Sequence, residues 1–160
     1  MNIFEFAMEK EKYSEIYYRE LAGKSNSKDL ETVFNMLADE EAKHYKIVSD
    51  MKEDVGPDLA ETTVLSDAKD VFAKMRESAR NFNFNISQIE LYRKAQNIEK
   101  QSQNFYLEKA NEVKKNQKEI FLKLADQEKN HYFLLENIID FVSRPETWLE
   151  NAEFYHLDEY

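Results

Sequence analysis

Apolar residues recur in four long segments of the chain at the three-to-four-residue spacing of an amphipathic α-helix. Gly23 and the Lys-Ser-Asn-Ser stretch that follows it predict a C-cap, a turn and a new N-cap. Gly56-Pro57 and Arg144-Pro145 predict the ends of the second and fourth helices, and Lys114–Asn116 predicts the break before the fourth. Helices are expected over about residues 2–23, 28–54, 86–113 and 117–142.

The links between these helices differ in length, and this difference predicts the topology. The first two helices and the last two are each joined by only a few residues, which favours two tight antiparallel hairpins. Between the hairpins lies a connector, residues 55–85, in which Ser66-Asp67 is expected to cap a short helix bearing Val71. Residues 146–158 predict a short tail helix. The expected fold is all-α: a four-helix bundle over residues 1–142 with one long crossover, and a tail, residues 143–160, that packs on the bundle or on a partner subunit.

The two predicted hairpins resemble each other in sequence. Phe34-x-x-Leu-Ala-Asp-x-Glu41-x-x-His44-Tyr recurs 87 residues later as Phe121-x-x-Leu-Ala-Asp-x-Glu128-x-x-His131-Tyr. The earlier helix of each hairpin repeats as well, because Glu11-Lys-x-Ser14 with Tyr18 recurs 88 residues later as Glu99-Lys-x-Ser102 with Tyr106. A duplicated helical hairpin is the simplest interpretation.

Each of the four apolar stripes carries a glutamate where an apolar residue is expected. Two of the stripes also carry a histidine three residues later, on the same face of the helix. All six residues lie at matching distances from the predicted turns, so they should meet at one level of the core. Left unpaired, each buried carboxylate would cost on the order of several kcal/mol. The six residues are Glu11, Glu41, His44, Glu99, Glu128 and His131.

Two divalent cations would compensate this buried charge. Their combined charge of +4 balances the four glutamates, and each neutral histidine adds one nitrogen ligand. The mixed oxygen and nitrogen ligands suit Fe, with Mn as an alternative and Zn as an opportunistic occupant. One Glu from each of two helices, with Glu-x-x-His from each of the other two, is the arrangement of di-iron carboxylate proteins of the ferritin-like kind. The sequence therefore predicts a site for two metal ions.

Composition excludes several other classes of protein. Two Gly and two Pro in 160 residues, 34% of them charged, favour long helices and few turns. The net charge of −10, without a basic stripe, argues against a nucleic-acid partner, and the absence of cysteine excludes disulfides and thiolate-bound metals. No signal peptide or membrane-spanning run is recognised, so a cytoplasmic location is expected. In so acidic a chain a lone Glu-x-x-His carries little weight, and Glu153-x-x-His156 in the tail is interpreted as a surface or packing feature.

At the six residues the chain resembles the rubrerythrin branch of the ferritin-like superfamily, over essentially residues 1–142. The resemblance implies three roles: terminal metal ligands, ligands that bridge the two metals, and histidines that each bind one metal. These roles fall, in that order, on Glu11 and Glu99, on Glu41 and Glu128, and on His44 and His131.

The resemblance also assigns roles outside the ligand set. It implies that Tyr18 and Tyr106, two turns from the glutamate of their own helix, hydrogen-bond the ligands, whereas aromatic residues at this spacing are also common in ordinary cores. Glu40 and Gln127, each four residues before a histidine, are further candidates to hydrogen-bond an imidazole.

Two departures from the rubrerythrin pattern bear on function. The family carries an extra glutamate one turn after the third-helix ligand, and this chain has Ser102 there, which puts efficient peroxide reduction in question. The family's Cys-rich rubredoxin-like tail is also missing, so electrons would have to come from a separate donor protein such as a rubredoxin.

The resemblance implies a diiron oxidoreductase that reduces hydrogen peroxide or O₂ in oxidative-stress defence. Three alternatives stay open: a ferroxidase or iron-storage and iron-handling protein, an interaction module with a purely structural metal site, and an enzyme that hydroxylates an organic substrate. The aromatic residues of the tail favour a homodimer if they are shared between subunits.

Overall fold

The computed structural model describes residues 2–53, 70–71 and 88–143, and nearly all of these residues are helical. Helix α1 covers Ile3–Lys24 and α2 covers Lys28–Lys52. Helix α4 covers Ile89–Lys109, the short 3-10 helix η3 covers Ala110–Glu112, and α5 covers Lys115–Ser143. Asp70 and Val71 also lie in a helical turn, and Val71 packs against the core. The predicted all-α ferritin-like four-helix bundle is confirmed.

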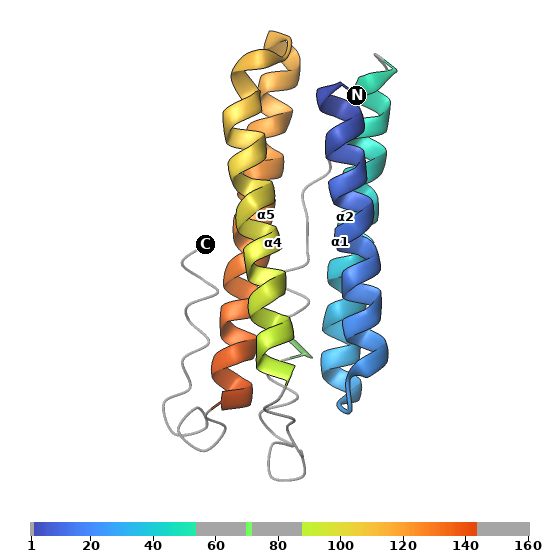
Figure 1. Cartoon of the computed structure of the whole chain (residues 1–160), viewed down its shortest axis with the longest axis vertical. Helices are drawn as coiled ribbons and strands as arrows, with labels where there is room; N and C mark the ends of the chain where they lie inside the picture. The colour runs from blue at the N-terminus through green and yellow to red at the C-terminus, as the bar shows by residue number, and fades with distance from the viewer. Residues whose placement is uncertain (1, 54–69, 72–87, 144–160) are drawn as a thin grey trace.

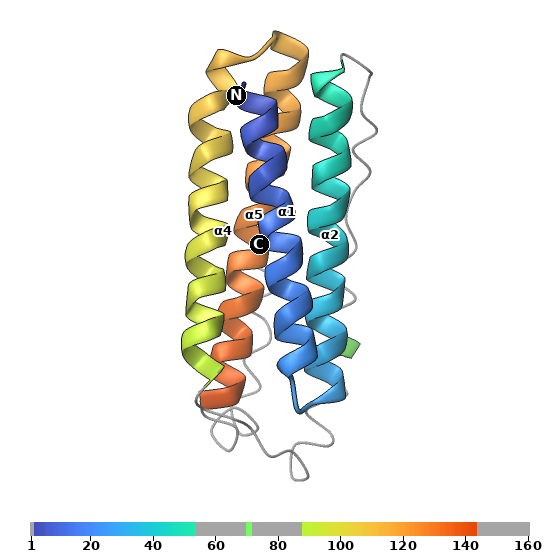
Figure 2. The same cartoon turned by 45° about the vertical axis from the view of Figure 1, so that its right-hand side comes forward.

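The four helices form two antiparallel hairpins that pack side by side (Figures 1 and 2). Helix α1 packs mainly on α2, and α4 packs mainly on α5. Across the bundle, α1 lies beside α4 and α2 beside α5. Helix α2 ends at the end of the bundle where α1 begins, whereas α4 begins at the opposite end (Figure 1). The end of α2 and the start of α4 therefore lie at opposite ends of the bundle, in agreement with one long crossover between the hairpins.

The start of α2 is fixed by a side-chain cap that the sequence predicted. The hydroxyl of Ser27, in extended backbone, accepts a hydrogen bond from the backbone N–H of Leu30 at 3.3 Å. The start of α5 uses a different device, because the Gln117 side-chain oxygen reaches back to accept from the backbone N–H of Lys114 at 3.2 Å. This is the glutamine half of a capping box.

Two details of the predicted boundaries were wrong. Gly23 is not a C-cap, because it lies inside α1. The C-cap is Ser25, which has extended backbone and donates its backbone N–H to the carbonyl of Ala22. The second break was placed at Lys114–Asn116, but α5 already begins at Lys115, because η3 turns the chain earlier. The connector, apart from residues 70–71, and the tail helix over 146–158 lie outside the described residues.

The interior contains two apolar clusters, one toward each end of the bundle. One cluster, at the α1–α2 turn, is built around Leu30, Phe34 and Tyr92. The other, toward the opposite end, is built around Ala7, Met51 and Phe121. Each fully buried large apolar side chain stabilises the fold by about 1.5–3 kcal/mol. The level between the two clusters is where the predicted ligands lie.

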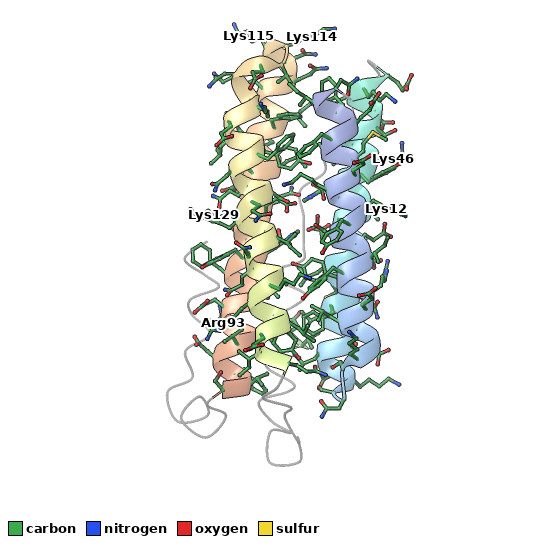
Figure 3. All side chains as sticks on the ribbon, in the orientation of Figure 1. Lys12, Lys46, Arg93, Lys114, Lys115 and Lys129 are labelled. Carbon is green, nitrogen blue, oxygen red and sulfur yellow. The ribbon has the colours of Figure 1, made fainter. Side chains whose placement is uncertain are left out.

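The outer faces of the helices carry the charges. Six labelled cationic side chains in Figure 3 are all exposed: Lys12, Lys46, Arg93, Lys114, Lys115 and Lys129. Among the helices that the structure describes, none is both long and apolar enough to span a lipid bilayer.

Candidate metal centre

All six predicted ligands lie in the bundle interior, and all four helices contribute. Glu11 comes from α1 and Glu99 from α4. Helix α2 supplies Glu41 and His44, and α5 supplies the repeated pair, Glu128 and His131. Each of the six side chains is at most 1% exposed. The sequence therefore placed the whole set correctly in the core.

The six side chains form two groups that share two members. Glu11 and His44 lie with Glu41 and Glu128 in one group, and Glu99 and His131 lie with the same two glutamates in the other. In each group, one potential ligand atom per residue lies within 4.8 Å of all the others. Glu41 and Glu128 thus have positions suited to bridging two ions, while the remaining four residues are each suited to one ion.

The histidines point at the shared glutamates of the facing helix. Nδ1 of His44 lies 2.6 Å from Oε1 of Glu128, and Nδ1 of His131 lies 2.9 Å from Oε1 of Glu41. The two rings are nearly parallel, with centroids 5.8 Å apart. Nδ1 is therefore the imidazole nitrogen that each histidine directs into the cluster.

The outer nitrogens of the two rings differ. Nε2 of His44 lies 2.6 Å from the side-chain oxygen of Gln127, which can accept its N–H and so leave Nδ1 free to bind a metal. Nε2 of His131 is buried and has no hydrogen-bond partner among the described residues. Gln127 therefore contacts the imidazole of the facing helix, and the two halves of the site are not equivalent.

Two tyrosines donate hydrogen bonds to the outer glutamates, and each tyrosine lies on the other hairpin from the glutamate it contacts. The hydroxyl of Tyr106, on α4, donates to Oε1 of Glu11, on α1, at 2.6 Å. The hydroxyl of Tyr18, on α1, donates in the same way to Oε1 of Glu99, on α4. Burial, together with the charge of the glutamate it contacts, raises the pKa of each tyrosine well above its usual value, so both remain protonated donors. Each tyrosine thus contacts the glutamate of the other hairpin, and the two contacts link the hairpins.

The ionised forms of the two shared glutamates, Glu41 and Glu128, are disfavoured by their surroundings. Burial raises the pKa of Glu41 well above its usual value, and the charges of Glu128, Glu11 and Glu99 raise it further. Burial acts in the same direction on the pKa of Glu128, with the charges of Glu11 and Glu99 adding to it. A carboxyl group with a raised pKa holds its proton more strongly, so metal binding at Glu41 and Glu128 would release protons.

The pKa values of the two outer glutamates, Glu11 and Glu99, are shifted in the opposite direction. Burial alone would raise the pKa of Glu99, but the charge and hydrogen bond of His131 and the hydrogen bond from Tyr18 lower it to about 2. Burial is likewise outweighed at Glu11, whose pKa is lowered chiefly by the charge of His44. Burial would lower the pKa of His44, but the charge of Glu11 and hydrogen bonds to Glu11 and Glu128 raise it well above its usual value.

Buried oxygens of the cluster that lack a hydrogen-bond partner indicate whether metal ions fit it. One oxygen of each glutamate is buried without a hydrogen-bond partner among the described residues, namely Oε2 of Glu11, Glu41, Glu99 and Glu128. An unpaired buried carboxylate oxygen costs on the order of 1–3 kcal/mol or more. Four such oxygens from four helices, with two imidazole nitrogens beside them, match the ligands of two divalent cations. The residues present therefore fit a site for two metal ions.

Three further residues lie near the six in the sequence, and of these only Lys10 was not singled out from the sequence. Ser14 and Ser102, repeat mates one turn after the outer glutamates, are each 2% exposed, and the Ser14 hydroxyl has no partner among the described residues. Lys10 is half-buried beside Glu11. The repeat indicated the two serines, whereas Lys10 has an isoleucine as its repeat mate and gave no signal. Glu153-x-x-His156 lies outside the described residues.

Comparison with known proteins adds one finding to this geometry. The family model described as Rubrerythrin matches residues 2–142, which include all six residues of the cluster. The comparisons with curated proteins and with solved structures found no match.

Proposed function

The chain belongs to the rubrerythrin family, and on that premise we propose that it is a diiron oxidoreductase that reduces hydrogen peroxide or O₂ with electrons from a separate donor protein. The observation that carries this proposal is the buried cluster with four unpaired carboxylate oxygens, one from each helix. When bound, two ferrous ions supply the two electrons that, with two protons, convert hydrogen peroxide into two water molecules.

The residues of the chain prepare the site in three ways. Glu41 and Glu128 would each contact both ions. Glu11 and His44 would bind one of the two ions, and Glu99 and His131 would bind the other. The hydroxyls of Tyr18 and Tyr106 hold one oxygen of each outer glutamate, which leaves the other oxygen free to bind metal. The apolar clusters on both sides keep bulk water away from the reacting atoms.

Iron is the proposed metal because the cluster combines carboxylate oxygens with imidazole nitrogens, a mixed ligand set that suits Fe. Manganese binds the same kinds of ligand, and zinc would bind strongly without supporting electron transfer. Metal analysis of the purified protein, together with Fe(II) titration under anaerobic conditions, tests this assignment. Two Fe(II) per chain are expected, and a protein that folds without metal and binds none would contradict it.

Ser102 favours a second candidate, an iron-handling protein that oxidises Fe(II) and then stores or transfers iron. Its buried hydroxyl stands one turn after Glu99, where a further carboxylate would give the centre another oxygen ligand during peroxide reduction. The Ser102 hydroxyl is neutral, so it cannot replace that carboxylate as a charged metal ligand. The two functions differ in what happens after the first oxidation.

A single anaerobic experiment separates these candidates. Protein loaded with two Fe(II) per chain is mixed with one equivalent of hydrogen peroxide, and oxidation is followed optically. Fast oxidation, recovery of the ferrous state with an external reductant and no mineral supports the oxidoreductase. Continued uptake of many irons per chain contradicts it in favour of storage. Glu41→Ala is the control, because it should remove the fast phase.

A further inference from the structure

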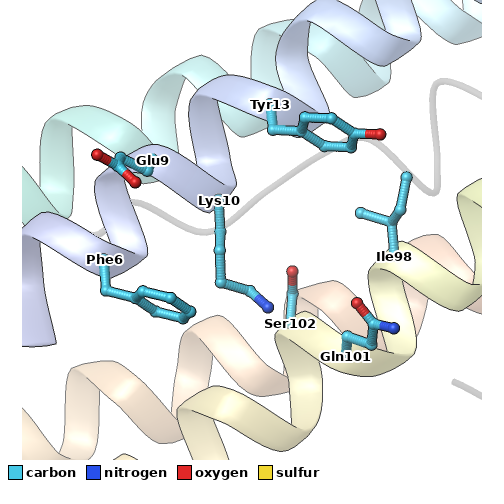
Figure 4. Close-up of a pocket in the computed structure, with 7 residues that line it drawn as sticks. All are labelled: Phe6, Glu9, Lys10, Tyr13, Ile98, Gln101 and Ser102. Carbon is cyan, nitrogen blue, oxygen red and sulfur yellow. The ribbon is translucent and has the colours of Figure 1, made fainter.

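A pocket of about 290 Å³ opens between α1 and α4 (Figure 4). Its lining has an apolar part and a polar part. Phe6, Tyr13 and Ile98 form the apolar part, and Lys10, Gln101 and Ser102 form the polar part. Pockets that enclose drug-sized ligands measure roughly 300–1,000 Å³, so this pocket suits a small molecule with one apolar end and one polar end.

Lys10 is an unusual member of this lining. Its side chain extends from α1 across the pocket toward Ser102 on α4 (Figure 4). Its ammonium lies 5.6 Å from the ring centres of both Phe6 and Phe105, and within the described residues it has no carboxylate at ion-pair distance. A cation held over two aromatic rings keeps donors available for an incoming oxygen atom.

The polar end of the pocket adjoins the cluster. Lys10 immediately precedes Glu11, and Ser102 stands one helical turn after Glu99. A ligand whose polar end contacts Lys10 and Ser102 is therefore directed toward the metal centre.

We propose that this pocket binds small organic hydroperoxides, with the hydrocarbon part on Phe6, Tyr13 and Ile98 and the peroxide group on Lys10 and Ser102. This inference rests on the proposed function and assigns its substrate class. Hydrogen peroxide is small and wholly polar, so it gains nothing from an aromatic wall, whereas an alkyl or aryl group gains about 25 cal/mol for each Å² it buries there.

The reaction is balanced as a two-electron reduction. The O–O bond of the hydroperoxide breaks, and the two oxygens leave as an alcohol and a water molecule. Two electrons from the reduced centre and two protons complete the step, and the external donor protein restores the electrons. Lys10 and Ser102 hold the peroxide group through hydrogen bonds.

The kinetic test compares cumene hydroperoxide with hydrogen peroxide on the iron-loaded protein. Wild type is expected to have the higher kcat/KM for cumene hydroperoxide. Phe6→Ala should lower that kcat/KM roughly tenfold, mainly through KM, because it removes the apolar wall on which the hydrocarbon part of the substrate is buried. The same variant should leave kcat/KM for hydrogen peroxide within about twofold. Leu107→Ala, which removes an equally exposed apolar side chain of α4 that does not line the pocket, is the matched control.

Lys10→Met tests the polar end, since it keeps the length of the side chain and removes the ammonium. The kcat/KM for cumene hydroperoxide should fall roughly 10- to 100-fold, the value of a hydrogen bond to a charged group. Lys12→Met, on the same helix but exposed and outside the pocket, should leave it unchanged. Equal changes with both peroxides in Phe6→Ala, or a wild type that prefers hydrogen peroxide, would overturn the inference.

A binding measurement separates this inference from the proposed function. Zinc-loaded protein, which cannot transfer electrons, is titrated with cumyl alcohol, the reaction product, and the Ile98 methyl resonance is followed by NMR. A saturable shift that Phe6→Ala weakens is expected. Absence of a shift in a protein that still reduces hydrogen peroxide overturns only the substrate class. A saturable shift in a protein inert to every peroxide overturns the proposed function, and with it the reaction assigned to the pocket.

Discussion

At the scale of single residues, the shared and the outer glutamates differ in their position in the cluster and in the direction of their pKa shifts. Glu41 and Glu128 belong to both groups of candidate ligands, whereas Glu11 and Glu99 each belong to one. The shared pair also retains protons most strongly, while the outer pair is held ionised by histidine and tyrosine. This difference in position leads to different expected effects of substitution.

Glu41→Ala should abolish the binding of both ions, whereas Glu11→Ala should leave about one ion per chain. The reason is that the first substitution removes a ligand common to both groups and the second removes a ligand from only one. Equilibrium dialysis with Fe(II) or Mn(II), followed by elemental analysis, measures the stoichiometry. Glu31→Ala, an exposed position near the start of the same helix, should retain both ions. Identical losses in Glu41→Ala and Glu11→Ala would show that the shared position has no special role.

Tyr106→Phe should weaken metal binding roughly 10- to 100-fold while the protein remains folded. The variant loses the donor that fixes Oε1 of Glu11, so that carboxylate is free to rotate away from its productive orientation. Competition with a chelator of known affinity measures the change. The matched control is Tyr92→Phe: Tyr92 is equally buried on α4, but its hydroxyl contacts Gln88 instead of a ligand. Equal affinities in the two variants would count against a role for the Tyr106 hydroxyl.

At the scale of elements, each helix is positioned by a few local signals and by its apolar stripe. Helix α2, like α5, carries one shared glutamate and one histidine of the site. Its first turn is held by Ser27, which is 4% exposed, and this cap fixes where the helix starts. A helix that frays at that end loses packing in the apolar cluster below the site.

Ser27→Ala should lower the free energy of unfolding by about 1 kcal/mol, within the 0.5–2 kcal/mol range of N-cap substitutions. The cause is the unpaired backbone N–H of Leu30. Urea denaturation of the metal-free protein measures the effect. Thr32→Ala, an exposed position in the same helix whose hydroxyl donates to the Lys28 carbonyl, should change it by less than about 0.5 kcal/mol. A cap that contributes nothing would leave the two variants equally stable.

The sequence predicted most of the fold because the signals for it are local and repeated. Apolar periodicity and the duplicated Glu-x-x-His fixed the four helices and the six buried residues, and equal distances from the turns placed those residues at one level. Gly23 misled because a glycine next to a turn resembles a C-cap even where the helix continues through it.

The contacts between side chains could not be predicted in the same way, since they depend on how the hairpins face each other. Gln127 was one of two candidates to contact an imidazole, and only the packed bundle shows that it contacts His44 on the facing helix. The crossed tyrosine contacts and the Lys10 pocket likewise join residues of different hairpins.

At the scale of the whole molecule, the buried charges make the stability of the metal-free protein depend on pH. Glu41, Glu128 and His44 have pKa values raised above those of the unfolded chain. Their contribution to stability is complete below the unfolded pKa and is lost as pH rises through the folded pKa. Glu99 and Glu11, with lowered pKa values, stabilise the fold above the usual carboxyl range and lose this effect only in acid, for Glu99 as pH falls toward about 2.

The free energy of unfolding of the metal-free protein should therefore fall as pH is raised from about 5 to about 8. The metal-loaded protein should show the opposite trend, because deprotonated ligands bind metal more tightly and bound metal stabilises the folded state. Urea denaturation across this range, with chelator or with excess metal, measures both slopes. Parallel slopes with and without metal would show that the cluster does not exchange protons for ions.

The inequivalent imidazoles have a consequence for how the protein gives up its metal. His44 is anchored at both nitrogens, whereas nothing among the described residues restrains the outer nitrogen of His131. The ion on the His131 side should thus dissociate first, so removal by a slow chelator should pass through a one-metal species that native mass spectrometry can detect. The repeat mate of Gln127 is Glu40, and this difference between the two halves accompanies the unequal hold on the imidazoles that gives the two ions an order of release.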